Sequence, residues 1–159
     1  MLLRISLVLP LVVLNGCSHF HPKPEPEYVY VLAKQTYLRD RVAAVSNRTA
    51  TVTNGQRLRV LEHGRRFLNV QTSKGETGWV EERTLVPQSV ADGFAALERD
   101  HLHDPEVATA VLRDELYMHL KPGRDTDKLY LLPEGEKLKL LARASVEKAD
   151  ASKIGRAHV

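Results

Sequence analysis

Alternating apolar and polar residues predict a short β-hairpin in the segment from Phe67 to Val80. Two alternating runs flank the polar turn Ser73–Gly75, an arrangement typical of a hairpin. Leu68 is then expected opposite Val80, and Asn69 opposite Trp79. One face carries Leu68, Val70 and Val80, and the other carries Phe67, Asn69 and Trp79. The first face is expected to join the core, and the second to form a half-exposed aromatic surface.

The same alternation predicts further short strands on both sides of this hairpin. They span Tyr28–Ala33, Tyr37–Asp40, Arg57–Val60 and Leu85–Val86, with a single helical turn at 82–84. The polar, poorly periodic segment 43–52 is expected to be a long loop, and Asn54-Gly55 a tight turn. Several short strands within about sixty residues favour a small β-barrel. Its predicted core consists of Leu58, Val60, Leu68, Val70 and Val80.

Gly78-Trp79-Val80 closes the hairpin and follows the glycine-bounded strand Gly55–Leu61. This order resembles a bacterial SH3-like (SH3b) domain, over about residues 28–86. The resemblance implies an all-β fold with an SH3-like barrel at 28–87. In relatives, the groove beside this hairpin binds peptides or cell-wall material.

The resemblance also points to three candidate ligand-binding residues in that groove. Trp79 matches the signature tryptophan, Phe67 stands where an aromatic residue begins the strand, and Tyr37 is expected on the same side. The alternative is that Trp79 only caps the barrel core. Tryptophan side chains often pack on a core and contact a ligand at the same time, so the residue type does not separate the two roles. Relatives commonly carry Asn-x-Arg after the first strand, where this chain has Tyr37-Leu38-Arg39, so their ligand specificity does not carry over directly.

A helical connector is expected at 88–104, after the barrel. Val90, Phe94, Leu97 and His101 recur at helical spacing, which predicts a helix over 90–101. Ser89–Asp92 resembles a capping box at its start. The helix is expected to pack on one barrel and to space it from the next.

The sequence then repeats itself at a fixed offset of 80 residues. Gly135–Leu138 matches Gly55–Leu58, Tyr117-Met118 matches Tyr37-Leu38, and Leu138–Leu141 matches Leu58–Leu61. Similarity at one offset indicates a second, incomplete copy of the SH3-like fold over 105–148. A disordered tail is expected at 149–159. Residues 154–159 match the translation of a sequencing adapter, so we expect them to be an artefact and the natural protein to continue.

The N-terminal residues 1–17 resemble a lipoprotein signal peptide. Arg4 precedes an apolar run too short to span a bilayer, and Leu14–Cys17 resembles a lipobox. Cys17, the only cysteine, would carry the lipid; an ordinary secretory signal is the alternative. Residues 18–27, rich in proline, are expected to form an extended tether. These features predict a lipid-anchored envelope protein, by default at the outer membrane and facing the periplasm.

Composition narrows the function further. The 159 residues include 23 Lys and Arg against 20 Asp and Glu, a net charge of +3 without a clustered basic patch, so we expect no nucleic-acid partner. No metal motif or glycine-rich phosphate loop is present in the sequence, so we expect neither cofactor nor metal, and no enzyme.

Three functional hypotheses remain. The first is a membrane-anchored, non-catalytic binding module for a cell-wall or peptide ligand, with peptidoglycan or envelope proteins as partners. The second is a structural or assembly spacer lipoprotein. The third is a fragment of a larger envelope enzyme.

Overall fold

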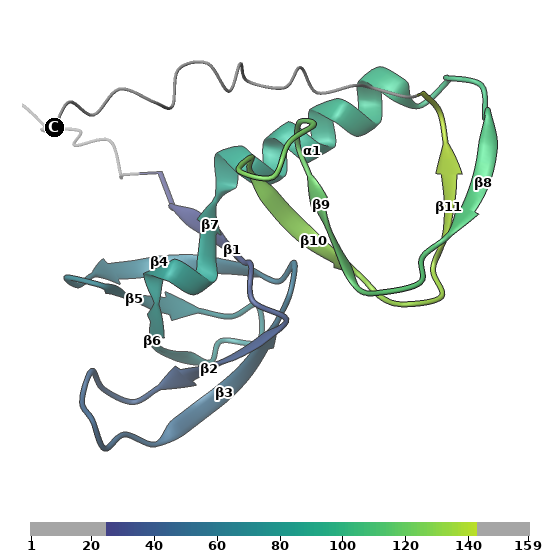
Figure 1. Ribbon diagram of the computed structural model, residues 1–159. Helices are drawn as coiled ribbons and strands as arrows, with labels where there is room; N and C mark the ends of the chain where they lie inside the picture. The colour runs from purple at the N-terminus through teal and green to yellow at the C-terminus, as the bar shows by residue number, and fades with distance from the viewer. Residues whose placement is uncertain (1–24, 143–159) are drawn as a thin grey trace, which may run out of the picture.

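The computed structural model describes residues 25–142, which form two β-rich units joined by one α-helix (Figure 1). The expectations for the signal peptide, Cys17, most of the tether and the segment from residue 143 onward lie outside this range. Within the described residues, no helix is both long and apolar enough to cross a membrane.

The first unit is a seven-stranded antiparallel sheet in the order β3-β2-β6-β5-β4-β1-β7. Its strands are β1 (Tyr28–Val31), β2 (Gln35–Arg39), β3 (Arg48–Thr53), β4 (Arg57–His63), β5 (Phe67–Gln71), β6 (Thr77–Glu81) and β7 (Leu85–Pro87). A 3-10 turn, η1 (Glu82–Thr84), joins β6 to β7 at the position expected for a single helical turn. The sheet curves around one core, as expected for an all-β, SH3-like barrel.

The central hairpin has the predicted register. Leu68 pairs with Val80, and Asn69 pairs with Trp79. Leu68, Val70 and Val80 are buried on the inner face, while Phe67 and Trp79 are half-buried on the outer face. The backbone N–H of Thr72 donates to the carbonyl of Glu76 at 2.9 Å and closes the turn. The alternation of apolar and polar residues therefore predicted both faces correctly.

Two expectations for the barrel were wrong in part. The segment 43–52 is not entirely a loop, because β3 begins at Arg48 and places Val52, with 0% exposure, in the core. Among the predicted core residues Val60 is only half-buried, since it packs at the margin of the cluster. The core instead gains Val29, Val31, Leu38, Val52 and Leu85.

The helix α1 (Gln88–His101) leaves the barrel directly after β7. No side chain caps its first turn, and Pro87 is its N-cap, so the expected capping box at Ser89–Asp92 is wrong. Proline fixes a backbone angle suited to this position, and the helix can begin without a side-chain acceptor. Its buried Phe94 meets the ring of Tyr130 edge-on at 5.4 Å, so the helix packs against the second unit as well as the barrel.

The second unit contains four strands in two antiparallel pairs. They are β8 (Ala108–Val111), β9 (Leu116–His119), β10 (Lys128–Leu132) and β11 (Lys137–Leu140), with β9 on β10 and β8 on β11. The pairing of β9 with β10 reproduces that of β2 with β3. Adding 80 to the pairs Thr36–Val52, Tyr37–Thr51 and Arg39–Arg48 gives Leu116–Leu132, Tyr117–Leu131 and His119–Lys128. Both pairs also contain a register shift before their last partner.

Two glycine turns show the same correspondence. Gly55 and Gly135 have φ of 77° and 83°, a conformation that favours glycine. The N–H of Gly55 donates to Val31 at 2.9 Å, and the N–H of Gly135 donates to Leu112 at 2.9 Å. Because Leu112 follows Val31 by 81 residues rather than 80, β8 is shifted by one residue relative to β1.

The second unit is open where the first is closed. Leu38, Val52 and Leu58 have 0% exposure, but Met118, Leu132 and Leu138, each 80 residues later, are all partly exposed. Met118 is 38% exposed. Residues 108–142 contain no counterparts of β5, β6 and β7, the strands that complete the first core. Figure 1 accordingly shows β8 and β11 standing apart from β9 and β10.

Candidate functional site

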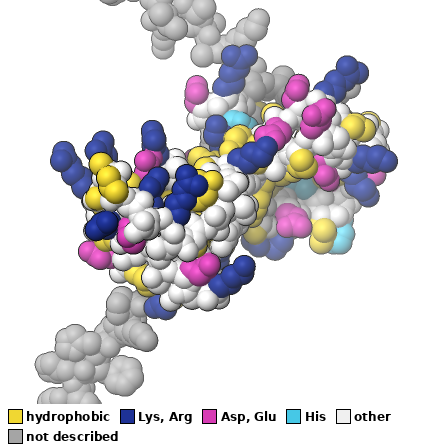
Figure 2. All heavy atoms as spheres, turned by 90° about the horizontal axis from the view of Figure 1, so that it is seen from below, with side chains coloured by type: hydrophobic (Ala, Val, Ile, Leu, Met, Phe, Trp, Pro, Cys, Tyr) yellow, Lys and Arg dark blue, Asp and Glu magenta, His cyan; other side chains and the backbone are white. Residues whose placement is uncertain are grey.

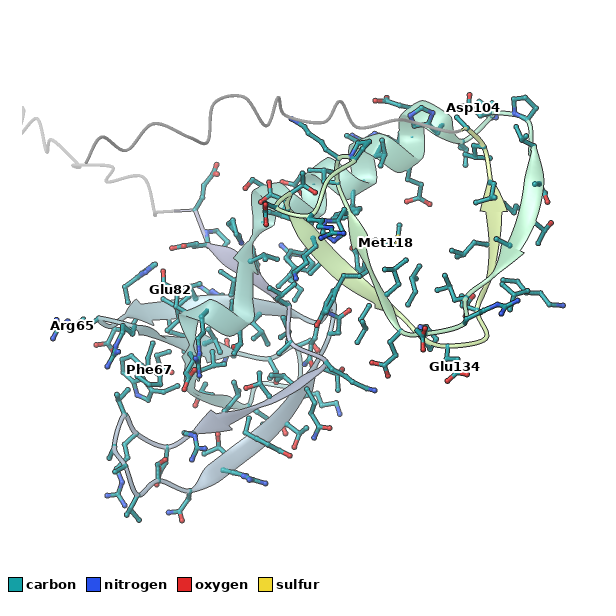
Figure 3. All side chains as sticks on the ribbon, viewed as in Figure 1. Arg65, Phe67, Glu82, Asp104, Met118 and Glu134 are labelled. Carbon is teal, nitrogen blue, oxygen red and sulfur yellow. The ribbon has the colours of Figure 1, made fainter. Side chains whose placement is uncertain are left out.

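Phe67 and Trp79 line one surface pocket of about 430 Å³ at the end of the barrel. Its lining comes from the loop after β2, the turn between β4 and β5, and the outer face of the central hairpin. The lining residues are Arg41, Val42, Gly64, Arg65, Arg66, Phe67 and Trp79. Arg65 and Phe67 lie at the end of the barrel farthest from the second unit (Figure 3). We call this the Trp79 pocket.

Trp79 is held in place by its neighbours on the sheet. It alternates with the buried residues Gly78 and Val80, and pairs with Asn69 on one side and Arg39 on the other. Gly64 lies against the edge of the indole: a Cβ at this glycine would sit 3.0 Å from Cζ3 of Trp79. This close approach packs the turn against the indole, which stays half-buried and lines the pocket.

Two hydrogen bonds shape the turn that carries the arginines. The N–H of Gly64 donates to the carbonyl of Phe67 at 2.8 Å, and the N–H of Glu82 donates to the carbonyl of Arg66 at 3.1 Å. The turn is therefore tied both to its own hairpin and to η1. Arg65 and Arg66 project from it into solvent, and both side chains are exposed.

The loop on the opposite rim is closed by Asp40 and Asn47. Asp40 accepts from the backbone N–H and from Nδ2 of Asn47, each at 3.0 Å. Desolvation raises the pKa of Asp40, but the hydrogen bonds from Asn47 and the charge of Arg41 outweigh it, so the pKa lies below the usual 3.8. This clamp positions Arg41 and Val42 beside the aromatic floor.

A second pocket of about 350 Å³ adjoins the first across Arg66 and Phe67. Glu81, Glu82 and Arg83 complete its lining. Glu81 is already paired with Arg83 through Nε and Oε2. The two adjoining pockets therefore differ in charge, with acidic groups in the second only.

The sequence identified Phe67 and Trp79 as candidates, and the structure brings these two together. Tyr37, the third candidate, does not line the Trp79 pocket. Its ring lies under the guanidinium of Arg48, 3.8 Å from the centroid, and its hydroxyl accepts from Gln35 at 3.3 Å.

Sequence reasoning missed Arg41, Val42, Arg65 and Arg66, which lie on turns outside the alternating pattern. The one available signal was the pair Arg65-Arg66 directly before Phe67.

The lining of the Trp79 pocket determines which ligand chemistry it can meet. Its lining offers guanidinium groups and apolar surface, and includes no His, Cys, Ser or carboxylate that could act as a nucleophile or general base. Elsewhere in residues 25–142, no three His, Cys, Asp or Glu side chains come together in a way that could hold a metal ion. The arrangement can hold a ligand that is apolar in part and negatively charged in part.

Comparison with protein families agrees with this architecture. Residues 34–86 match the family model of the bacterial SH3 domain, from the start region of β2 to β7. No curated protein matches the chain. The matched segment contains every residue that lines the Trp79 pocket. Residues 34–86, which cover β2 to β7 of the first unit, are therefore a bacterial SH3 domain.

Proposed function

We propose that this protein is a non-catalytic binding module of the bacterial cell envelope, which holds a cell-wall or peptide ligand in the Trp79 pocket. The observation that carries the proposal is the pocket itself, where Phe67 and Trp79 form an apolar floor within the bacterial SH3 domain. Bacterial SH3 domains are typically modules of this kind. Aromatic rings give a large contact area at small entropic cost, which suits a ligand-binding surface.

Binding to purified peptidoglycan tests this function. We expect wild-type protein to sediment with peptidoglycan and Trp79→Leu to remain largely in the supernatant. Tyr37→Leu is the matched control, because Tyr37 is a half-buried aromatic residue of the same domain that lies outside the pocket. A wild-type protein that ignores peptidoglycan would refute the cell-wall reading, and Tyr37→Leu behaving like Trp79→Leu would refute the assignment to this pocket.

We further propose that Cys17 carries a lipid anchor and that the protein faces the periplasm from the outer membrane. The lipobox-like Leu14–Cys17 and the proline-rich tether support this location. Cells expressing the wild type and Cys17→Ser, labelled with a radioactive fatty acid, provide the test. Label on the wild type alone is expected, and equal label on both would contradict the anchor.

The second unit supports a spacer role as the alternative function. Its β9–β10 register and its glycine turn correspond to those of the barrel, which supports an incomplete SH3-like repeat. Asn54 joins the two units by hydrogen bonds to the backbone of Leu129 and Leu131, each at 2.8 Å. Two units joined in this way would hold a partner at a set distance from the membrane. This alternative gains weight if the wild type binds envelope proteins but not peptidoglycan.

A further inference from the structure

Three arginines surround the apolar floor of the Trp79 pocket. Arg41 comes from the loop after β2, and Arg65 and Arg66 come from the turn between β4 and β5. Among the described residues, Arg65 and Arg66 form no ion pair, and Arg41 reaches only Asp40, at 3.9 Å. Figure 2 shows dark blue side chains around yellow hydrophobic atoms at the barrel end of the molecule. The positive charge at this rim is therefore largely uncompensated.

The apolar side chains of the Trp79 pocket are exposed to solvent to a large extent. Val42 is 51% exposed, and Phe67 and Trp79 are only half-buried. Exposed aliphatic and aromatic groups that gather at one hollow, with a polar rim, mark a site for a partner rather than ordinary surface. The hollow and the arginines share the same lining, so one ligand meets both.

Acidic groups on the far side of Phe67 determine which of the two adjoining pockets can take the acidic part of a ligand. Glu81 and Glu82 line the adjoining pocket, where Glu81 is paired with Arg83. Glu82 repels a ligand carboxylate on that side, whereas Arg41 and Arg65 attract it on the other, and Arg66 lies at the boundary that both pockets share. The charge pattern therefore places the acidic part of a ligand in the Trp79 pocket and not in its neighbour.

We propose that the Trp79 pocket selects peptide segments in which a carboxylate side chain neighbours an aliphatic or aromatic one. This inference rests on the proposed binding function and names the ligand chemistry of the same site. The planar guanidinium fork matches a carboxylate with two parallel hydrogen bonds, and the aromatic floor takes the adjacent apolar group. The two features lie within one pocket of about 430 Å³, a size that suits a few residues of peptide.

Other ligand classes use only half of these features. A neutral glycan stacks on Phe67 and Trp79 but has no use for three arginines. A simple polyanion is attracted by the arginines but gains nothing from the apolar floor. A peptide that carries acidic and apolar side chains side by side satisfies both, so the lining favours it over either alternative.

Fluorescence titration with synthetic peptides tests the proposal directly. Trp79 is the only tryptophan of the chain, so its emission reports on the pocket. The probes are an acetylated, amidated hexapeptide of alternating Leu and Glu, the same peptide with Gln in place of Glu, and poly-glutamate. We expect saturable binding of the Leu/Glu peptide, about tenfold weaker binding of the Leu/Gln peptide, and weak binding of poly-glutamate. Binding of the Leu/Glu peptide should weaken as salt rises.

A matched pair of variants separates local from general electrostatics. The double variant Arg65→Gln with Arg66→Gln removes two positive charges from the pocket rim. The control, Arg59→Gln with Arg113→Gln, removes two exposed positive charges elsewhere. We expect about tenfold loss of affinity for the Leu/Glu peptide in the first and less than about twofold in the second. Circular dichroism confirms that each variant is folded.

Each outcome decides between the proposal and its rivals. Equal binding of the Leu/Glu and Leu/Gln peptides, or equal losses in the two double variants, overturns the inference. So does poly-glutamate binding as tightly as the Leu/Glu peptide. If the wild type sediments with peptidoglycan through Trp79 but ignores all three probes, the inference fails and the proposed function stands. If it binds the Leu/Glu peptide but not peptidoglycan, the cell-wall function fails and the ligand chemistry stands.

Discussion

The side chain of Asn54 accepts a hydrogen bond from the backbone N–H of Leu131 at 2.8 Å, across the boundary between the two units. The same amide donates through Nδ2 to the carbonyls of Leu32 at 2.6 Å and Leu129 at 2.8 Å. Tyr117 adds a hydrogen bond from its hydroxyl to Leu32 at 3.0 Å. The two units therefore meet through backbone groups of both, which the Asn54 amide and the Tyr117 hydroxyl hold together.

Asn54→Ala is expected to loosen this joint. The loss leaves partly buried backbone groups without partners, which costs about 1–3 kcal/mol. Hydrogen exchange should rise in β10 while β4 and β5 stay protected. Glu134→Ala is the control, since Glu134 occupies the corresponding turn of the second unit and is exposed. Unchanged exchange in β10 of the Asn54 variant would contradict the joint.

Leu58 and Leu61 offer a matched test of the barrel core. Both are leucines on β4, but Leu58 has 0% exposure and Leu61 has 47%. Leu58→Ala should destabilise the protein by about 2–5 kcal/mol, because it removes packing and leaves a cavity. Leu61→Ala should cost less than about 0.5 kcal/mol. Urea unfolding followed by Trp79 fluorescence measures both, and similar costs would contradict the assignment of the core.

The clamp between Asp40 and Asn47 predicts a dependence on pH. Because the pKa of Asp40 is depressed in the folded state, its contribution to stability is present above the usual pKa of 3.8 and is lost as pH falls through the lower folded value. Asp40→Ala should therefore lower the melting temperature at pH 6 and have little effect at the lowest pH at which the wild type stays folded. Asp92→Ala, on the exposed face of α1, serves as control. An Asp40 effect that is equal at both pH values would rule out the clamp.

Grafting tests the correspondence between the two units. Residues 64–87 form the part of the barrel that has no counterpart in residues 108–142. At the offset of 80, residue 143 corresponds to His63 and is therefore the place to attach this part. In the chimera, a second copy of residues 64–87 follows residue 143. It should close the second unit, because β11 corresponds to β4 and the grafted copy of β5 can pair with β11 as β5 pairs with β4. We expect weaker binding of the dye ANS and a higher melting temperature, since Met118 and Leu140 become covered.

The control graft carries serine at the positions derived from Leu68, Val70 and Val80. It supplies the same backbone without the apolar face, so it should leave ANS binding unchanged. A gain in stability from both grafts alike would mean that the added segment acts without completing the core.

Alternation predicted the hairpin well, because a half-buried sheet imposes a period of two on its side chains. It was not recognised at β3, where Ala50 and Val52 alternate with threonines, because only Val52 is fully buried and the small Ala50 packs at the margin of the core. Such an edge strand is defined by its hydrogen bonds to β2 and not by its own composition. The helix was found from its apolar spacing, while its start depended on the direct passage from β7 through Pro87.

The residues of the candidate site likewise fall into those that a local sequence pattern predicts and those that only the tertiary structure brings together. Phe67 and Trp79 belong to a hairpin whose geometry is local, so their sequence pattern sufficed. Arg41 and Val42 reach the pocket only because the loop after β2 folds back across about twenty residues of chain toward Gly64. Tyr37 shares a strand face with Arg39, which pairs with Trp79, but Arg48 covers its ring. Contacts of this kind arise from tertiary structure, which residue patterns do not report.

The joint at Asn54 also limits how many such units can be stacked. Asn54 works there because an amide donates and accepts at once. Glu134, eighty residues later, presents a carboxylate, which at neutral pH can only accept. A further unit docked in the same manner would bring two backbone carbonyls against that negative charge. The geometry that links the barrel to its neighbour therefore cannot be repeated with Glu134 in the place of Asn54.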